Sequence, residues 1–528
     1  MSLLHDDKNR VTATLYKNLE ENIDTIGALF KDCADVIKRK MTIGGANKID
    51  IYLVYIDNMI NKELLEMSTV QMIFKDDILD MPAEEQFEFL KEKAIQTVDI
   101  SEQITMSQCI EAILSGDTIV FVDGYEKALK ISVRGMANRG VPTSESEVSI
   151  RGSKESFSEA FHINRVLLRR RIKDTNFKIK QIKVGTRTRT DVAICFLEDV
   201  AKPEIVADIE NRLKEFVIDG IFDSGMLEQL TERNIYSPFP EFQSTERPDK
   251  AASAILEGRI VLIVDNSPVV LILPTTLNSF FQASDDAYTR WEVATFIRVL
   301  RYIGAILSMC LPGLYIAVVN YNAELLSPAM ALSFAAARSG VPFSVLFEVI
   351  IMEIAFQMLL EAGIRLPGPM GGTLGIVGGL IIGDAAVNAN IVSPIVVIVI
   401  ALTAISAFTV PNEPFSSAFR IVRYLVIILS AFLGLFGFIL GVMILMIHLG
   451  GLKSFGIPYM VPFAASGINE GTDTKDAIIR FPFRMLKRRP IFAERDERTR
   501  LVSEEEDNSK KENNKNENLK KGNDRKGK

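Results

Sequence analysis

The stretch GGTLGIVGGLIIGDAAV, residues 371–387, carries a glycine at every fourth position of an otherwise apolar run: Gly371, Gly375, Gly379 and Gly383. In a water-exposed helix each glycine costs about 1 kcal/mol relative to alanine, so an ordinary soluble helix is not expected to contain four. Residues four apart share one helix face, and in lipid a face without side chains lets another backbone approach closely. The repeat therefore predicts a helix-packing or oligomer face inside a membrane.

Charge is distributed unevenly around this stretch. Residues 302–466 carry few charges, whereas residues 1–290 and 467–528 are rich in them. The segments with the length or composition for bilayer contact are 302–319, 343–360, 391–410 and 425–447. Basic residues flank the first and last segments, which places both ends in the cytoplasm and requires an even number of spans. We expect an α-helical multi-pass transmembrane domain over 291–466, with about four spans.

The glycine run is too short to cross a bilayer comfortably by itself. It is separated from the next apolar segment by NANIVSP, residues 388–394, which is typical of a break in a helix. We therefore expect a half-helix or re-entrant segment, surrounded by protein or water, with an ordinary fifth span as the alternative.

Polar side chains interrupt this apolar region. Glu353, Gln357 and Glu361 recur at helical spacing on one face, and Asp384 and Asn388 directly follow the glycine run. A carboxylate at mid-membrane costs about 3 kcal/mol, so such groups usually face protein or water. They are candidates for the polar lining of a cation-attracting pore.

A structural interpretation of these groups stays open beside the pore. Glu361 can pair with Arg365 one turn away, Glu348 and Glu353 can pair with other helices, and the glycines can pack within one protomer.

Residues 1–290 alternate helical and strand-like patterns, which predicts a cytosolic α+β domain of two lobes divided near 133–155. Strands are expected at 178–184 and 191–197, a hairpin over 258–274, and helices at 7–39, 157–174 and 202–217. After the membrane domain we expect a basic cytoplasmic segment, 467–500, and a disordered tail, 501–528.

No catalytic, cofactor-binding or metal-binding motif is present in the sequence, so we expect neither an enzyme nor a bound cofactor or metal. The four cysteines stand far apart, which suits reduced cytosolic thiols. The basic stretch NRVLLRRRIKD, residues 164–174, is compatible with anionic lipid, but such a stripe is more often a salt-bridged face, and nucleic acid is not expected.

Three distinctive strings are FPEFQSTERPDKAASAILEGRIVLIVDNSPVVLILP from residue 239, SFFQASDDAYTRW from residue 279 and PNEPFSSAFRIVRY from residue 411. These and other strings resemble the A subunit of the GerA family of bacterial spore germination proteins. Upstream, RGSKESFSEAFHINRVLLRRRI from residue 151 is similar to the Arg-Gly, Phe-x-Glu and Asn-x-x-Leu-x-Arg-Arg-Arg pattern of that family. The resemblance covers roughly residues 110–490.

The resemblance implies a spore inner membrane protein that acts with a permease-like B subunit and a lipoprotein C subunit. It further implies that copies of the A subunit form a homo-oligomeric, nutrient-gated ion channel that triggers germination. A secondary transporter built on the broken segment 371–394, and a paralogue that amplifies germination without sensing nutrient, are the alternatives.

By position, the resemblance places a segment that couples the soluble domain to the membrane at Thr245, Glu246, Arg247, Pro248 and Asp249. A polar turn held by an Arg–carboxylate pair is the structural alternative. The chain departs from the family pattern at 153–155, where Ser-Lys-Glu replaces Gly-Pro-Arg, and at 287–288, where Ala-Tyr replaces paired tyrosines.

Overall fold

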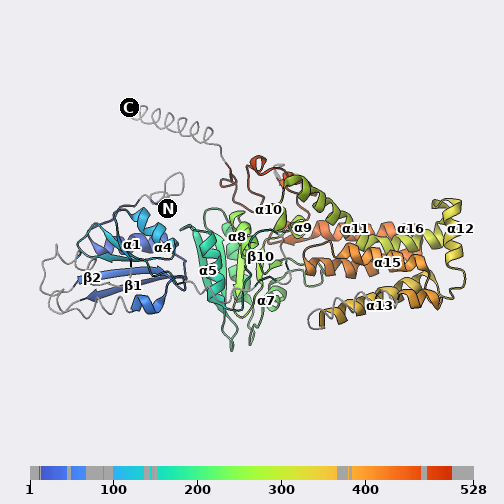
Figure 1. Cartoon of the computed structure of the whole chain (residues 1–528), viewed down its shortest axis with the longest axis horizontal. Coiled ribbons are helices and arrows are strands. Elements are labelled where there is room, and N and C mark those ends of the chain that lie inside the picture. The colour runs from blue at the N-terminus through green and yellow to red at the C-terminus, as the bar shows by residue number, and fades with distance from the viewer. Residues whose placement is uncertain are drawn as a thin grey trace, which may run out of the picture. The chain divides into compact units, whose positions relative to one another are not determined.

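The computed structural model describes residues 11, 13–43, 49–66, 87, 99–135, 143–144, 147, 151–365, 379, 383–464 and 473–501. Its contacts divide the chain into two units, whose elements are labelled in Figure 1. The first unit comprises Met1–Arg233, Ser244–Pro274 and Lys487–Lys528, and the second comprises Asn234–Gln243 and Thr275–Leu486. The division therefore does not follow a single cut near residue 290, because the chain returns to the first unit after the second.

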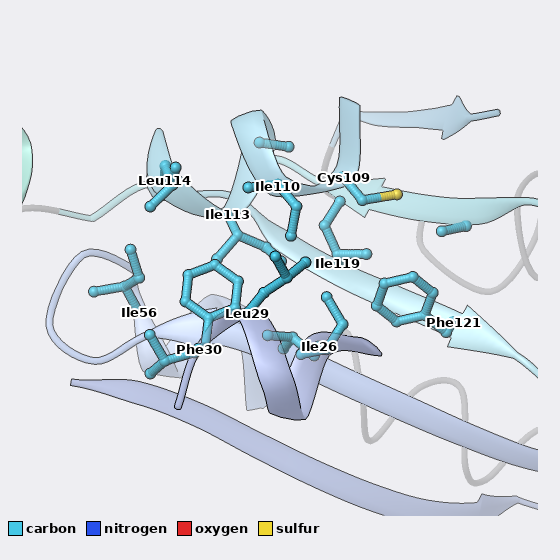
Figure 2. Packing of buried hydrophobic residues seen from close by; sticks show 14 of the residues in the cluster. Ile26, Leu29, Phe30, Ile56, Cys109, Ile110, Ile113, Leu114, Ile119 and Phe121 are labelled. Atoms are coloured by element: carbon cyan, nitrogen blue, oxygen red, sulfur yellow. The ribbon is translucent and has the colours of Figure 1, made fainter. Parts of the chain in front are cut away.

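The first unit begins with a five-stranded antiparallel sheet in the order β1-β2-β4-β5-β3. Its strands are β1 (Val36–Ile43), β2 (Ile49–Ile56), β3 (Ile100–Gln103), β4 (Thr118–Val122) and β5 (Ala128–Ile131). Helices α1 (Leu19–Leu29) and α4 (Met106–Leu114) supply most of the core on one face. Figure 2 shows Ile26 and Phe30 from the α1 side packing toward Ile110, Ile113 and Phe121 of α4 and β4.

Helix α1 is shorter than the helix predicted over residues 7–39. Asn18 caps its start by accepting a hydrogen bond from the Glu20 backbone N–H, and residues from Val36 onward belong to β1. Because β1 pairs with β2 along its whole length, tertiary pairing decides the conformation there.

The second sheet of the first unit has the order β6-β7-β9-β10-β8. Its strands are β6 (Phe177–Val184), β7 (Thr190–Leu197), β8 (Gln243–Thr245), β9 (Ile260–Val264) and β10 (Val270–Leu273). The predicted strand pair is confirmed, with Val184 opposite Thr190, and so is the predicted hairpin, with Leu271 opposite Leu262. The helices are α5 (Phe161–Arg171), α6 (Pro203–Glu215), α7 (Ser224–Thr231) and α8 (Pro248–Leu256).

The C-terminal segment completes the core of this second sheet. Ala493 is fully buried in the cluster that contains Phe177, Cys195 and Ile272, and it forms a β-bridge with Ala201. A Cβ on Gly258 would lie 2.7 Å from Ala493 Cα, so glycine permits the close approach of the two backbones.

The second unit consists mostly of helices. Its helices are α9 (Leu277–Phe281), α10 (Asp285–Tyr288), α11 (Trp291–Tyr321), α12 (Pro328–Ala337), α13 (Val345–Arg365), α15 (Pro394–Ala407) and α16 (Glu413–Gly451), and two short strands follow, β11 (Lys453–Ser454) and β12 (Ile457–Pro458). Among the described residues, α11 and α16 are long and apolar enough to cross a membrane, while α12 and α15 are shorter apolar helices. The predicted count of four spans is therefore not confirmed.

Helix α16 is a helical hairpin rather than one straight rod. Gly434 interrupts it with φ +58° and ψ −139°. A Cβ on Gly441 would lie 3.4 Å from Val426 Cα, whereas these residues would be roughly 22 Å apart along a straight helix. The two legs, 413–433 and 435–451, are about 31 and 25 Å long. The single span predicted over 425–447 is therefore wrong, because the chain reverses in the middle of that run.

Glycines bring the first helix of this bundle close to its neighbours. A Cβ on Gly304 of α11 would lie 2.1 Å from Thr409 Oγ1, and one on Gly313 would lie 2.7 Å from a Val426 methyl carbon. This is the close packing of small residues expected in lipid, but it occurs within one chain and away from the predicted glycine face.

Candidate functional site

An ion pair joins α13 to the first leg of α16. Arg423 Nη1 donates to both carboxylate oxygens of Glu353, at 3.0 and 2.7 Å. The two side chains are only 6% and 5% exposed, so each charge is neutralised inside the protomer. Glu353 is predicted above as polar lining, with an ion pair to another helix as the alternative. In the structure it forms that ion pair.

Glu348, in the first turn of α13, holds the start of α15. It is fully buried, and its Oε2 accepts a 2.8 Å hydrogen bond from the backbone N–H of Ser393, the N-cap of that helix. Its Oε1 lies 3.3 Å from Arg338 Nη2, at the end of α12. The carboxylate therefore fixes three elements of the bundle at one point, and it too is paired within the chain.

The remaining predicted lining residues are exposed. Gln357 and Glu361 lie on the exposed surface of α13, and Asp384 and Asn388 lie on the exposed surface of the helical residues 383–388. The chain leaves that helix at the predicted break, where Asn390 takes a positive φ of 52° before α15 begins. Gln357, Glu361, Asp384 and Asn388 therefore form an exposed polar set on a mainly apolar unit.

The four predicted face glycines differ in their surroundings. Gly371 and Gly375 lie outside the described residues. Gly379 is exposed, and a Cβ there would meet no atom within 4 Å, whereas Gly383 is buried and its Cβ would contact Val397 at an ordinary 3.5 Å. At Gly379, at least, no described part of the same chain requires the absence of a side chain.

The predicted coupling segment connects β8 to α8 in the first unit. Arg247 is buried and forms two bonds with Asp249, from Nε at 3.1 Å and from Nη2 at 2.7 Å. Its backbone N–H donates to Thr245 Oγ1 at 3.1 Å, and Pro248 occupies the first position of α8. The Arg–carboxylate pair, which the sequence offers as the structural alternative for this segment, is therefore present.

The same segment binds residues from the region before α5. Arg247 Nη1 and Nη2 donate to the carbonyl oxygens of Glu147 and Ser153, at 3.3 and 3.1 Å. The Glu147 carboxylate accepts hydrogen bonds from Thr245 Oγ1 and from Lys250 Nζ. The coupling segment thus ties the connection between the two sheets to β8 and α8, a pairing about 100 residues apart that sequence spacing does not reveal.

The arginines at the end of α5 bind carboxylates inside the protein. Arg169 is fully buried and binds Asp35 through Nε and Nη2, at 2.7 and 2.9 Å. Arg170 and Arg171 both pair with Glu155, a residue of the segment that departs from the family pattern. The stripe is therefore an intraprotein salt-bridge surface, and the lipid interpretation of it is not supported.

A second buried charge cluster, missed from the sequence, lies at the start of α11. Arg298 donates to Asp286 at 2.9 Å and to Asp476 at 2.7 Å, and Arg301 donates to both oxygens of Asp286. The sequence signal was available, because Arg298 and Arg301 are one turn apart and an Asp pair precedes the helix. Sequence alone predicts for these arginines only a position beside the first membrane segment.

Within the described ranges, no three His, Cys, Asp or Glu side chains gather as a metal site would require. Burial raises the pKa of the Cys109 thiol to about 12 and raises that of Cys33 as well. Such thiols stay protonated near neutral pH.

Comparisons with known proteins agree with the sequence resemblance. The family model described as Bacillus/Clostridium GerA spore germination protein matches residues 24–492. Spore germination protein KA of Bacillus subtilis (strain 168) is 34% identical, covering 93% of this chain and 88% of its own. Spore germination protein GerLA of Bacillus cereus is 38% identical over 78% and 83% of the two chains.

The relatives also include the uncharacterized membrane protein YfkQ of Bacillus subtilis (strain 168), 36% identical over 92% of this chain and 93% of its own. Among solved structures, the N-terminal domain of the A subunit of the Bacillus megaterium spore germinant receptor GerK3 is 27% identical. It matches with a TM-score of 0.41, over 50% of this chain and 98% of that domain. The family model and the full-length relatives together show that the chain belongs to the GerA family of spore germination proteins.

Proposed function

We propose that the chain is the A subunit of a spore germinant receptor in the spore inner membrane, where copies of it form a nutrient-gated cation channel. The exposed polar set on the second unit carries this proposal. A carboxylate facing lipid at mid-membrane costs about 3 kcal/mol, so Glu361 and Asp384 are expected to face water or another copy. Glu348 and Glu353 are buried, whereas Glu361 and Asp384 are exposed, so we assign cation attraction to Glu361 and Asp384.

The number of membrane passes follows from where the chain starts and ends. Residues before Arg233 and after Lys487 pack in the same unit, so a chain that crosses a membrane between them must cross an even number of times. The hairpin of α16 supplies two passes where one was predicted. We propose an even number of passes, which include α11, α13, α15 and the two legs of α16.

Oligomerisation is proposed to use the glycine face. Nothing in the described part of the same chain lies within 4 Å of a Cβ on Gly379, so a side chain added there meets none of the described residues. If the face packs against a second copy, a bulky side chain will separate the two helices.

The test compares Gly379→Leu with Gly379→Ala as the matched small substitution. We expect the leucine variant to lose both the oligomer, measured by cross-linking through a Gly375→Cys substitution added to each variant, and the nutrient response of spores. The alanine variant should keep most of both. A leucine variant with normal oligomer size and normal response would refute the proposed face.

Thr245–Asp249 is proposed to transmit a change in the soluble domain to the membrane, in a receptor that also contains the permease-like B and lipoprotein C subunits. Arg247→Lys keeps the charge but loses the two-point contact with Asp249. We expect it to weaken the nutrient response while oligomer size stays unchanged. An unchanged response would leave the segment with a structural role alone.

Two other functions are tested separately. The break at 388–393 is also what a transporter site with a discontinuous helix would require, and saturable nutrient uptake by the chain alone would favour it. A germination-amplifying paralogue would lack genes for B and C subunits beside its own. No catalytic role is proposed.

A further inference from the structure

Two surface loops of the first unit are bound tightly to each other. They are residues 185–189, between β6 and β7, and residues 217–222, after α6; we call them the paired loops. The backbone N–H groups of Thr186 and Arg187 donate to the carbonyl oxygens of Ile218 and Asp219, both at 2.8 Å. Thr190 Oγ1 also donates to the Ile221 carbonyl oxygen at 2.7 Å. The loops therefore move as one rigid element.

Glycines make this close pairing possible. Gly185 has a φ of +90°, and a Cβ on it would lie 3.2 Å from Gly220 Cα. A Cβ on Gly220 would lie 2.4 Å from a Thr188 methyl carbon. These contacts hold the two backbones at one distance from each other.

The paired loops expose apolar and basic side chains together. Val217 is 87% exposed and Phe222 is 68% exposed, with Arg187 and Arg189 exposed on the opposite loop. Asp219 lies 3.6 Å from Arg187 and offsets one of the two positive charges. A fixed aromatic and a fixed aliphatic side chain beside arginines suit the boundary between lipid chains and anionic headgroups.

The chain between Phe222 and the second unit is short. From Phe222 it runs through α7 to Asn234, the first residue of the second unit, a path of about 25 Å. Three residues later in that segment, Ser237 Oγ lies 2.9 Å from His448 Nε2, at the end of the second leg of α16. Phe239 packs against Phe415, at the start of the first leg. The segment is thus attached where both legs of the hairpin meet the bilayer surface.

We propose that the paired loops dock on the bilayer surface, with Val217 and Phe222 entering the headgroup region and Arg187 and Arg189 contacting anionic lipid phosphates. This contact is separate from the proposed channel, and the proposal does not depend on the function of the second unit. It would give the soluble unit a second attachment to the membrane besides the chain itself.

Fluorescence from one tryptophan tests the docking in the full-length chain. The natural sequence has a single tryptophan, Trp291, which is first replaced by phenylalanine. Phe222→Trp is then reconstituted into vesicles of phosphatidylcholine and phosphatidylglycerol, with or without brominated acyl chains. Ile104→Trp, an apolar residue 65% exposed on the first sheet's lobe, is the matched control. Val217→Trp is a second reporter in case the first variant does not fold.

We expect bromolipid to quench the tryptophan at 222 at least twofold and to leave the one at 104 unchanged. Replacing both arginines by glutamate, or phosphatidylglycerol by phosphatidylcholine, should reduce the quenching. Equal emission from brominated and plain vesicles at both 217 and 222 would overturn the proposal. Shielding of those tryptophans from acrylamide without bromolipid quenching would also overturn it and would indicate a protein partner.

Discussion

At the scale of single residues, Glu228 makes the stability of the first unit depend on pH. Burial in α7, with Glu232 and Asp223 nearby, raises the pKa of Glu228 from 4.5 to about 8. The folded protein therefore holds a proton that the unfolded chain releases above pH 4.5, so stability falls as pH rises from about 4.5 to 8.

Glu228→Gln should remove this dependence, because glutamine has no proton to lose. We expect the wild-type melting temperature to fall between about pH 5.5 and 8 and that of the variant to fall less. Glu215→Gln, at an exposed position of α6, is the control. Equal pH slopes for the wild type and Glu228→Gln would contradict the prediction.

For the buried pair of Glu353 and Arg423, removing one charge should destabilise the protein more than removing both charges. Glu353→Gln leaves the buried guanidinium without its counter-ion and should destabilise the second unit by about 3–5 kcal/mol. Arg423→Met combined with Glu353→Gln should recover part of that loss, because no unpaired charge remains. Thermal unfolding of the purified chain measures both, and additive losses in the double variant would refute the coupling.

At the scale of elements, the turn of the α16 hairpin depends on Gly434. Its φ and ψ are suited to glycine, and a Cβ would lie 2.9 Å from Tyr321. We expect Gly434→Ala to destabilise the unit by about 1–3 kcal/mol. Gly450→Ala in the second leg, where a Cβ meets nothing within 4 Å, should be neutral or stabilising, and both are compared by thermal unfolding.

An element can be predicted from the sequence when the residues that determine it are close together along the chain. The pair β6–β7 and the hairpin β9–β10 follow from short loops between alternating or apolar runs, which are local signals. The reversal at Gly434 leaves no trace in hydropathy, because the residues on both sides are equally apolar. The partner of Glu353 lies 70 residues along the chain, so no spacing rule identifies it.

At the scale of the whole molecule, the first unit needs its distant C-terminal segment. Ending the chain after Leu486 removes Ala493 from the core of the second sheet, together with the Arg489 Nε bond to the Leu256 carbonyl oxygen. We expect that truncation to make the first unit sensitive to protease. Ending the chain after Leu501 spares these contacts and should have little effect, and limited proteolysis of membranes containing each chain distinguishes the two.

The position of Ala493 also bears on the order in which the protein is made. The strands of the second sheet are synthesised long before Ala493, the residue that completes their core. The helices of the second unit are synthesised in between. In the proposed topology, the core of the second sheet is therefore completed only after the membrane helices have been inserted and the chain has returned to the compartment of the first unit. In that topology, an insertion error that left the C-terminus on the other side of the membrane would leave this core incomplete and accessible to quality-control proteases.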